Sequence, residues 1–238
     1  HYYGLIGLLS TFSLYKRLTE LHIYGPKGIK EIIELQLKLG KSWLSYSLVF
    51  HELETTTSKI IFENDKVSVS TIPLNHRIYT SGYLFKEKIG ERKLNMKAIN
   101  KIEDIKICDY QNLKNGKDFT KDDGSILKNK SLTLDPLPTK SYAFCSDTCF
   151  DNDIVPLIDG VDLLYHESTF LDIDAALALK TKHSTAKEAA TIAKKAKVNQ
   201  LILGHFSSRY KDESLFLTEA SPIFKNVILA EEGKIIEL

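Results

Sequence analysis

Two histidines, His183 and His205, lie on either side of a complete predicted helix and strand, so both can face one cleft. Thr185 and Glu188 fit the T-x-x-E pattern of a capping box, which predicts a helix that begins directly after His183. The continuous apolar run 201–203 then predicts a buried strand that leads to His205. In open α/β sheets ligands bind beyond the carboxyl ends of the strands, so both imidazoles are candidate site residues.

Ionisable residues follow three earlier predicted strands in the same way. These strands and the residues after them are 67–74 with His76, 142–145 with Asp147, and 161–165 with His166 and Glu167. Imidazoles and carboxylates that converge from several strand ends are the ligands that zinc prefers in proteins. One histidine at a strand end is commonly structural, whereas four strands that end in register favour a metal site.

The composition is that of an ordinary globular chain of 238 residues, 43% hydrophobic and 26% charged, which is enough for one sizeable core. A net charge of +1 does not mark a nucleic-acid binder, so any basic surface must be local. No apolar run is long enough to span a bilayer, and no signal peptide is visible. Cys108, Cys145 and Cys149 form no C-x-x-C pair, which indicates a reducing compartment such as the cytoplasm and cysteines that serve as apolar filler.

Helical and alternating apolar periodicities predict the other elements. The predicted helices are 2–17, 29–39, 185–197 and 212–220, and the further strands are 21–24, 48–53, 59–63 and 79–85, with a carboxyl-terminal hairpin of 226–230 and 234–237. Gly82 lies within a predicted strand and indicates close approach by another part of the chain. His22 and His51 fall in mid-strand, where a structural or surface role is expected. Because no repeat, low-complexity tract or linker divides the sequence, we expect one domain over 1–238.

The segment 86–117 differs from its surroundings, with nine Lys or Arg against five Asp or Glu. Met96, Ile99 and Ile102 form one short helical pattern in it. Such a segment is either a solvated insertion or a basic arm that contacts the phosphates of a nucleic acid, where each neutralised phosphate releases a counterion. Charge alone favours the solvated insertion.

Five motifs resemble ribonuclease Z, the tRNA 3′-end processing endonuclease family of the metallo-β-lactamase superfamily. In the family's order, they are 74–76 (LNH) with 82–83 (GY), 144–148 (FCSDT), 166–170 (HESTF), 183–186 (HSTA) and 201–210 (LILGHFSSRY). The likeness covers nearly the whole chain and is closest to the short form of the Bacteroidota. It implies an α/β fold of the αββα metallo-β-lactamase type.

The resemblance also implies two zinc ions per subunit in the complete protein. His76 would serve one zinc, His1 and His205 the other, and Asp147 would bridge both. Of the family's H-x-H-x-D-H signature, only the last histidine corresponds to a residue here, as His1. We therefore expect the amino-terminal strands and the rest of that motif to lie outside this chain, and zinc to bind weakly or to be absent without them.

The implied activity is removal of the 3′ trailer from precursor tRNA, which leaves a 3′-hydroxyl. Asp147, Glu167 and His183 are the implied catalytic residues, with Glu167 and His183 transferring a proton to the leaving oxygen. The family's P-x-K-x-G loop aligns with 112–116, which lacks the proline, and 86–117 becomes its basic arm. The residues expected to contact RNA are Lys93, Lys97, Lys101, Lys114, Gly116 and Arg209. We also expect the protein to form a homodimer, to be cytoplasmic and not to associate with a membrane.

Two other classes of function stay open at this point. A different hydrolase of the same fold, acting on a lactone, a thioester or a small phosphodiester, would keep the metal ligands but would need neither His183 nor a basic arm. A non-catalytic tRNA-binding module is the other alternative, because half of the metal signature is outside the chain.

Overall fold

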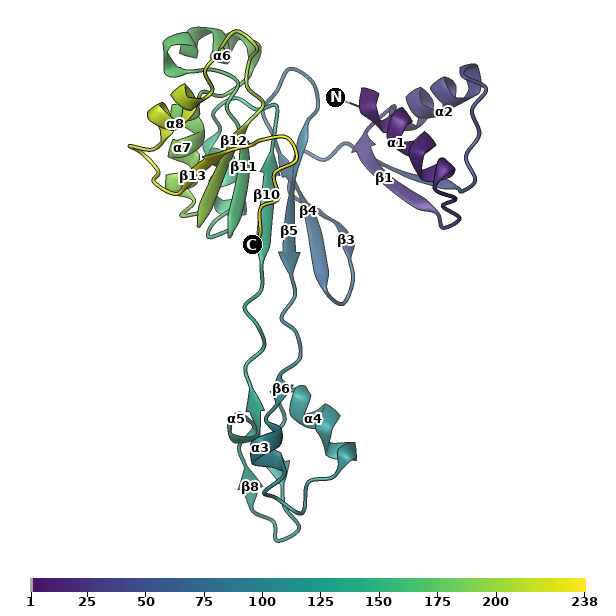
Figure 1. The fold of residues 1–238 in the computed structure, drawn as a ribbon, viewed down its shortest axis with the longest axis vertical. Coiled ribbons are helices and arrows are strands. Elements are labelled where there is room, and N and C mark those ends of the chain that lie inside the picture. The colour runs from purple at the N-terminus through teal and green to yellow at the C-terminus, as the bar shows by residue number, and fades with distance from the viewer. Residues whose placement is uncertain (1) are drawn as a thin grey trace.

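A computed structural model describes residues 2–238, and a seven-stranded mixed sheet forms its centre (Figure 1). The strand order is β13-β12-β11-β10-β5-β4-β3. The strands are β3 (Ile60–Glu63), β4 (Val67–Pro73), β5 (Ser81–Glu87), β10 (Ser141–Cys145), β11 (Leu163–Glu167), β12 (Gln200–Gly204) and β13 (Val227–Leu229). Most are short apolar runs of the kind that favours extended backbone within a sheet.

Strand direction brings the ionisable residues to one edge of this sheet. β10, β11, β12 and β13 are mutually parallel. β5 is antiparallel to both β10 and β4, so β4 runs in the same direction as β10. The predicted convergence of four strand ends is therefore confirmed. The residues at this edge are His76 after β4, Asp147 after β10, Glu167 at the last position of β11 and His205 after β12.

Helices cover one face of the sheet and close the main hydrophobic core (Figure 1). They are α7 (Ala186–Lys195) and α8 (Ser214–Ala220), with the 3-10 helix η2 (Asn152–Leu157). The 3-10 helix η3 (Asp172–Asp174) and α6 (Ala175–Thr181) contact each other outside this core. The predicted capping box is confirmed, because the Thr185 hydroxyl accepts from Glu188 N at 3.2 Å and the Glu188 carboxylate accepts from Thr185 N at 2.9 Å. The alanine face of α7 is fully buried against the strands, since small side chains allow close approach.

The amino-terminal part forms a separate unit beside the main sheet (Figure 1). β1 (Leu21–Pro26) and β2 (Leu48–Leu53) pair in parallel, and α1 (Tyr3–Leu14) and α2 (Ile29–Leu39) pack on them around Leu9, Ile23 and Ile33. His22 and His51 lie in mid-strand as predicted, with His22 Nδ1 2.8 Å from His51 Nε2.

A long projection leaves the sheet between β5 and β10 (Figure 1). It contains β6 (Lys93–Leu94), α3 (Met96–Ile99), η1 (Ile107–Asp109), α4 (Tyr110–Lys114), β7 (Phe119–Thr120), β8 (Ile126–Leu127), α5 (Asn129–Leu132) and β9 (Thr133–Leu134). Ile99, Leu113 and Leu132 form its own buried core, and β6 pairs with β9. This projection is the arm. It continues past Lys117 to β9, whereas the excess of basic residues that predicted an arm covers only 86–117.

Two predicted elements differ from the structure. The carboxyl-terminal hairpin is wrong, because β13 pairs in parallel with β12 and residues 234–237 form no strand. The turn at Glu232–Gly233 is real, with Lys234 N bonded to Glu231 O, but a local turn signal does not determine which strand is the partner. The strand predicted over 161–165 instead includes His166 and Glu167, which are both buried.

Gly82 is the glycine whose lack of a side chain matters most for the sheet. A Cβ atom there would lie 2.4 Å from the Phe144 backbone oxygen, which neighbouring strands hold in place. We expect Gly82→Ala to lower the free energy of unfolding by about 3 kcal/mol, because the backbone must shift to relieve the overlap. Urea denaturation measures this loss. Gly90→Ala is the matched control, since a Cβ at Gly90 meets nothing within 4 Å; equal stability of both variants would contradict the prediction.

Candidate metal centre and active site

Asp147 and His205 occupy unusual backbone positions directly after their strands. Both have positive φ, at 58° for Asp147 and 62° for His205, a left-handed conformation that non-glycine residues adopt rarely and at a cost of about 1–3 kcal/mol. The turn aims the two side chains at each other, with His205 Nε2 3.2 Å from Asp147 Oδ1. Strained backbone of this kind clusters at functional sites, where the surrounding structure holds it in place.

Four ionisable side chains converge at this edge of the sheet. Asp147, Glu167, His183 and His205 each offer an atom of a metal-binding type, and these atoms all lie within 4.8 Å of one another. The two carboxyl groups are buried and the two imidazoles are partly exposed, so the group opens to solvent on its histidine side. The rings of His183 and His205 are stacked, with centroids 5.4 Å apart.

Glu167 is fully buried and lies at the centre of a hydrogen-bond network. Its carboxylate accepts from the backbone N–H groups of Thr148, Thr169 and Ser184 at 2.9–3.1 Å. The Thr169 hydroxyl donates to it at 2.6 Å, and His183 Nδ1 lies 2.7 Å away. Burial opposes ionisation of this group, but the hydrogen bonds from His183 and Thr169 outweigh burial and lower the pKa of Glu167. The carboxylate is therefore ionised and fixed in orientation.

His183 is the partner that this buried carboxylate polarises. The hydrogen bond to Glu167 raises the pKa of His183, against the opposing effect of partial burial. Because Nδ1 faces Glu167, Nε2 is the nitrogen left to face a bound substrate. A histidine held in this way can carry a proton at neutral pH and deliver it to a leaving group.

His76 lies beside this group rather than within it. Its ring centroid is 5.0 Å from that of His183, and its Nδ1 is 2.8 Å from the backbone oxygen of Lys182. The carbonyl holds the ring so that Nε2 remains available to a metal, the usual arrangement for a ligand histidine. His1, the other predicted ligand, lies outside the described residues, and its role stays a prediction.

Thr169 was missed by sequence reasoning although it contacts three of the four residues. Its hydroxyl oxygen lies 2.6 Å from Glu167, 2.8 Å from His205 Nδ1 and 3.3 Å from His183 Nδ1. The sequence could have indicated this role, because a threonine two positions after a strand-end carboxylate, as Thr169 is after Glu167, can fold back and donate a hydrogen bond to it. The two cysteines at this edge, Cys145 and Cys149, are buried and are not among the metal-binding group of the described residues.

The predicted RNA-contacting residues lie in two places. Lys93, Lys97 and Lys101 are exposed on the arm, on or next to β6 and α3. Lys114, at the end of α4, lies 3.9 Å from Glu91, and Gly116 follows with φ of 85°. Arg209 lies near the active site instead of on the arm. Its guanidinium stacks over the Phe170 ring at 5.2 Å, and the Phe170 ring contacts that of His183.

The side chains of this group fit zinc on chemical grounds. Imidazole nitrogens and carboxylate oxygens suit a borderline-soft divalent ion, and the carboxylate oxygen of Asp147 lies 3.2 Å from an imidazole nitrogen of His205, so both can face one ion.

None of the helices within residues 2–238 is both long and apolar enough to cross a bilayer.

Known proteins resemble the chain in sequence. A protein named ribonuclease Z from Bacteroides fragilis is 42% identical over 238 residues, which are 100% of this chain and 78% of that protein. Ribonuclease Z from Cytophaga hutchinsonii is 47% identical over 234 residues, or 98% of this chain and 74% of the relative. No family model matches the chain.

Solved structures resemble it in fold. The short form of human tRNase Z superposes with a TM-score of 0.65 at 24% identity, over 100% of this chain and 74% of that one. The metallo-β-lactamase-fold protein YhfI from Bacillus subtilis gives a TM-score of 0.60 at 16% identity, over 98% and 71% of the two chains. The predicted metallo-β-lactamase fold class is confirmed.

Proposed function

The chain belongs to the ribonuclease Z family of metal-dependent endoribonucleases, and from this premise we propose that it uses zinc to cut the 3′ trailer from precursor tRNA and leaves a 3′-hydroxyl on the tRNA. The observation that carries the proposal is the convergence of Asp147, Glu167, His183 and His205 at one edge of the sheet. This group combines metal-binding side chains with a polarised imidazole, which together can activate water and protonate the leaving oxygen of a phosphodiester.

We assign metal binding to Asp147, His76 and His205, which would hold the zinc together with His1. When bound, zinc polarises the phosphate oxygens and activates water for attack on phosphorus. Thr169 fixes the His205 ring from behind, through its contact with Nδ1 at 2.8 Å. Such support from behind a ligand typically changes metal affinity or activity by about 10- to 100-fold.

We assign proton transfer to His183 and its orientation to Glu167. As the bond from phosphorus to the 3′-oxygen breaks, the leaving oxygen gains negative charge and needs a proton. His183 supplies it from Nε2, and Glu167 stabilises the protonated ring through Nδ1 at 2.7 Å. Because the Glu167 carboxylate is held by several further donors, it does not reorient during this step.

The arm is proposed to grip the body of the tRNA. It joins β10 at the amino end of that strand, whereas Asp147 follows the carboxyl end, so five residues, or roughly 16 Å of strand, separate them. The arm therefore points away from the site of its own subunit (Figure 1). This placement supports a homodimer in which one subunit's arm holds tRNA at the partner's site. The cytoplasm is the compartment that this substrate implies.

Incubation of the full-length protein with a precursor tRNA tests the proposal. We expect one cut at the start of the trailer, a 3′-hydroxyl on the tRNA, loss of cleavage on chelation and recovery with added zinc. End-group analysis of the two products measures the position and chemistry of the cut. Hydrolysis of a small chromogenic diester without cleavage of precursor tRNA would assign the chain to another hydrolase of this fold. Binding of tRNA without any cleavage would support the non-catalytic alternative.

A further inference from the structure

The residue before His183 has a strained backbone conformation. Lys182, which ends α6, has φ of 62° and ψ of 48°. Glycine adopts this left-handed conformation freely, whereas residues with a side chain adopt it rarely. The turn is closed by the two backbone hydrogen bonds of a helix that ends in this way. His183 N donates to Ala178 O at 2.9 Å, and Lys182 N donates to Leu179 O at 3.3 Å.

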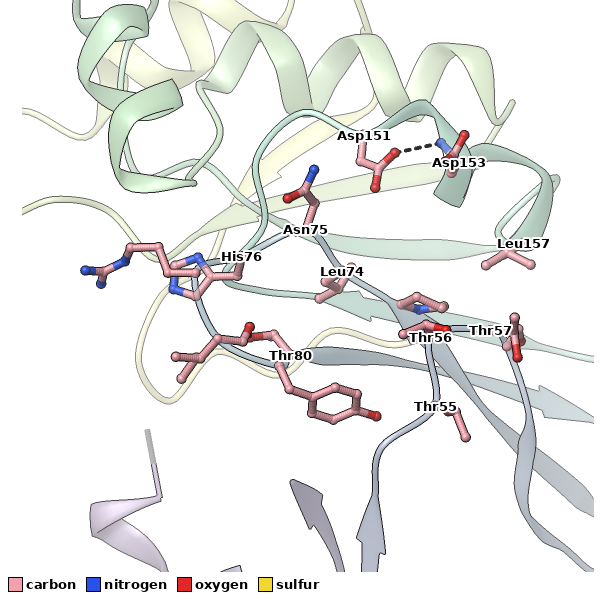
Figure 2. A pocket seen from close by; sticks show the side chains of 15 residues that line it. Thr55, Thr56, Thr57, Leu74, Asn75, His76, Thr80, Asp151, Asp153 and Leu157 are labelled. Carbon is pink, nitrogen blue, oxygen red and sulfur yellow. Dashed lines mark hydrogen bonds between the residues drawn. The ribbon is translucent and has the colours of Figure 1, made fainter. Parts of the chain in front are cut away.

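The backbone carbonyl of Lys182 holds the ring of His76. His76 follows the end of β4 (Figure 2), and its Nδ1 lies 2.8 Å from Lys182 O. Because a carbonyl oxygen only accepts hydrogen bonds, Nδ1 carries the hydrogen and Nε2 keeps the lone pair that a metal needs. The contact joins residues 106 positions apart. The loop before α7 thus supports a metal-binding residue at the end of β4.

The same peptide unit places His183. Its ring centroid is 5.0 Å from that of His76, and its Nδ1 lies 2.7 Å from Glu167. Directly after it, Ser184 N donates to the Glu167 carboxylate at 3.1 Å, which fixes the chain on that side. Because α6 fixes the chain on the other side, rotation of the Lys182 backbone would move its carbonyl and His183 together.

The side chain of Lys182 contributes less to the site than its backbone. Nζ lies 3.3 Å from Asn75 Oδ1, just beyond the usual range of an N–H···O hydrogen bond, and the contact is exposed. A contact of this length in water does not hold either residue firmly. The left-handed backbone is therefore the feature of Lys182 on which the two histidines depend.

We propose that Lys182 is a positioning residue whose left-handed backbone couples the metal-binding His76 to the proton donor His183. The inference rests on the proposed function, because the roles of the two histidines are assigned there. In this conformation one peptide unit directs its carbonyl to His76 and holds His183 against Glu167. Rotation into the ordinary helical or extended region would turn the carbonyl away from His76 and move His183 from Glu167.

Lys182→Val tests the backbone, since a β-branched residue is strongly disfavoured in the left-handed region. In the full-length protein we expect zinc affinity to fall about 10- to 100-fold, the usual effect of losing the support behind a ligand histidine. Competition with a chromogenic chelator measures this affinity. At saturating zinc we expect kcat on precursor tRNA to fall about tenfold or more while KM stays within about twofold, because His183 acts in the transition state.

Lys182→Gly and Lys182→Asn separate the backbone from the charge. Both new residues accept left-handed backbone, and both lack the ammonium group. We expect zinc affinity and kcat within about twofold of wild type in both variants, and a Tm at least as high as that of wild type in Lys182→Gly, where the strain is relieved. Losses as large as those of Lys182→Val would assign the effect to the ammonium group and overturn the proposal.

Lys197→Val is the matched control, because Lys197 follows α7 with φ of 50° and the same pair of backbone bonds. Val198 N donates to Ala193 O and Lys197 N to Lys194 O, both at 3.2 Å. This turn is at the opposite end of α7 from His183. We expect Lys197→Val to lower the Tm as Lys182→Val does, with zinc affinity and kcat unchanged. Equal losses of zinc affinity in the two variants would mean general destabilisation and overturn the proposal.

Zinc binding is measured without RNA, so this inference and the proposed function can fail separately. If the wild-type protein binds zinc but cuts no precursor, the proposed function fails, and the zinc affinities of the variants still decide whether Lys182 supports the metal-binding residue. Where the wild-type protein cuts precursor, unchanged zinc affinity or unchanged kcat in Lys182→Val would overturn the coupling.

Discussion

His183→Ala reduces cleavage of precursor tRNA at saturating substrate by about 100-fold or more, the usual scale of a lost general acid. The physical reason is that the fully buried Glu167 carboxylate, 2.7 Å from His183 Nδ1, stabilises the protonated ring that gives its proton to the leaving oxygen. The affinity for tRNA stays nearly unchanged, because His183 acts in the transition state rather than in ground-state binding. Single-turnover rates and a filter-binding assay measure the two quantities separately.

His51→Ala is the matched control, since His51 is also a partly exposed histidine but lies in mid-strand in the amino-terminal unit. It should leave the rate unchanged. Glu167→Gln should follow His183→Ala in direction, because an amide cannot stabilise the protonated ring as a carboxylate does. A normal turnover rate in His183→Ala would remove the proton-donor assignment. A parallel fall in tRNA affinity would make His183 a binding residue instead.

The strand-end part of the site could be predicted because it depends on local pattern. Short apolar runs that end in His76, Asp147 and His205 placed each residue at a strand exit, and the capping box placed His183 just before α7. The direction of the strands then brings these exits to one edge, which the alternation of helix and strand already favours. The family resemblance added roles, but the positions followed from periodicity.

The rest of the site depends on contacts between residues far apart in the chain. Thr148 N and Ser184 N both donate to Glu167 at 2.9–3.1 Å, across 19 and 17 positions of sequence. No periodic pattern encodes such pairs, and neither does it encode the left-handed backbone of Asp147. The predicted carboxyl-terminal hairpin fails for the same reason, because strand pairing with β12 is decided by burial across the sheet.

Conversion of Lys93, Lys97 and Lys101 to Glu weakens binding of precursor tRNA by about 100-fold at low salt. Each lost phosphate contact removes about 1 kcal/mol, and about 1.4 kcal/mol corresponds to a factor of ten. The slope of log affinity against log salt falls by about three units, because three counterions fewer are released. The three lysines are exposed, and none takes part in a salt bridge among the described residues, so their charges are available to a partner.

Hydrolysis of a small chromogenic diester separates a binding role from a structural one, because such a substrate reports the metal site and is too short to reach the arm. We expect the triple variant to lose far more activity on tRNA than on the diester. Lys30, Lys38 and Lys225, changed together to Glu, form the matched control, since these exposed lysines lie outside the arm and carry the same change in charge. Equal losses on both substrates would mean that the arm lysines support the fold. An unchanged salt slope would mean that 86–117 is a solvated insertion and that tRNA is held elsewhere.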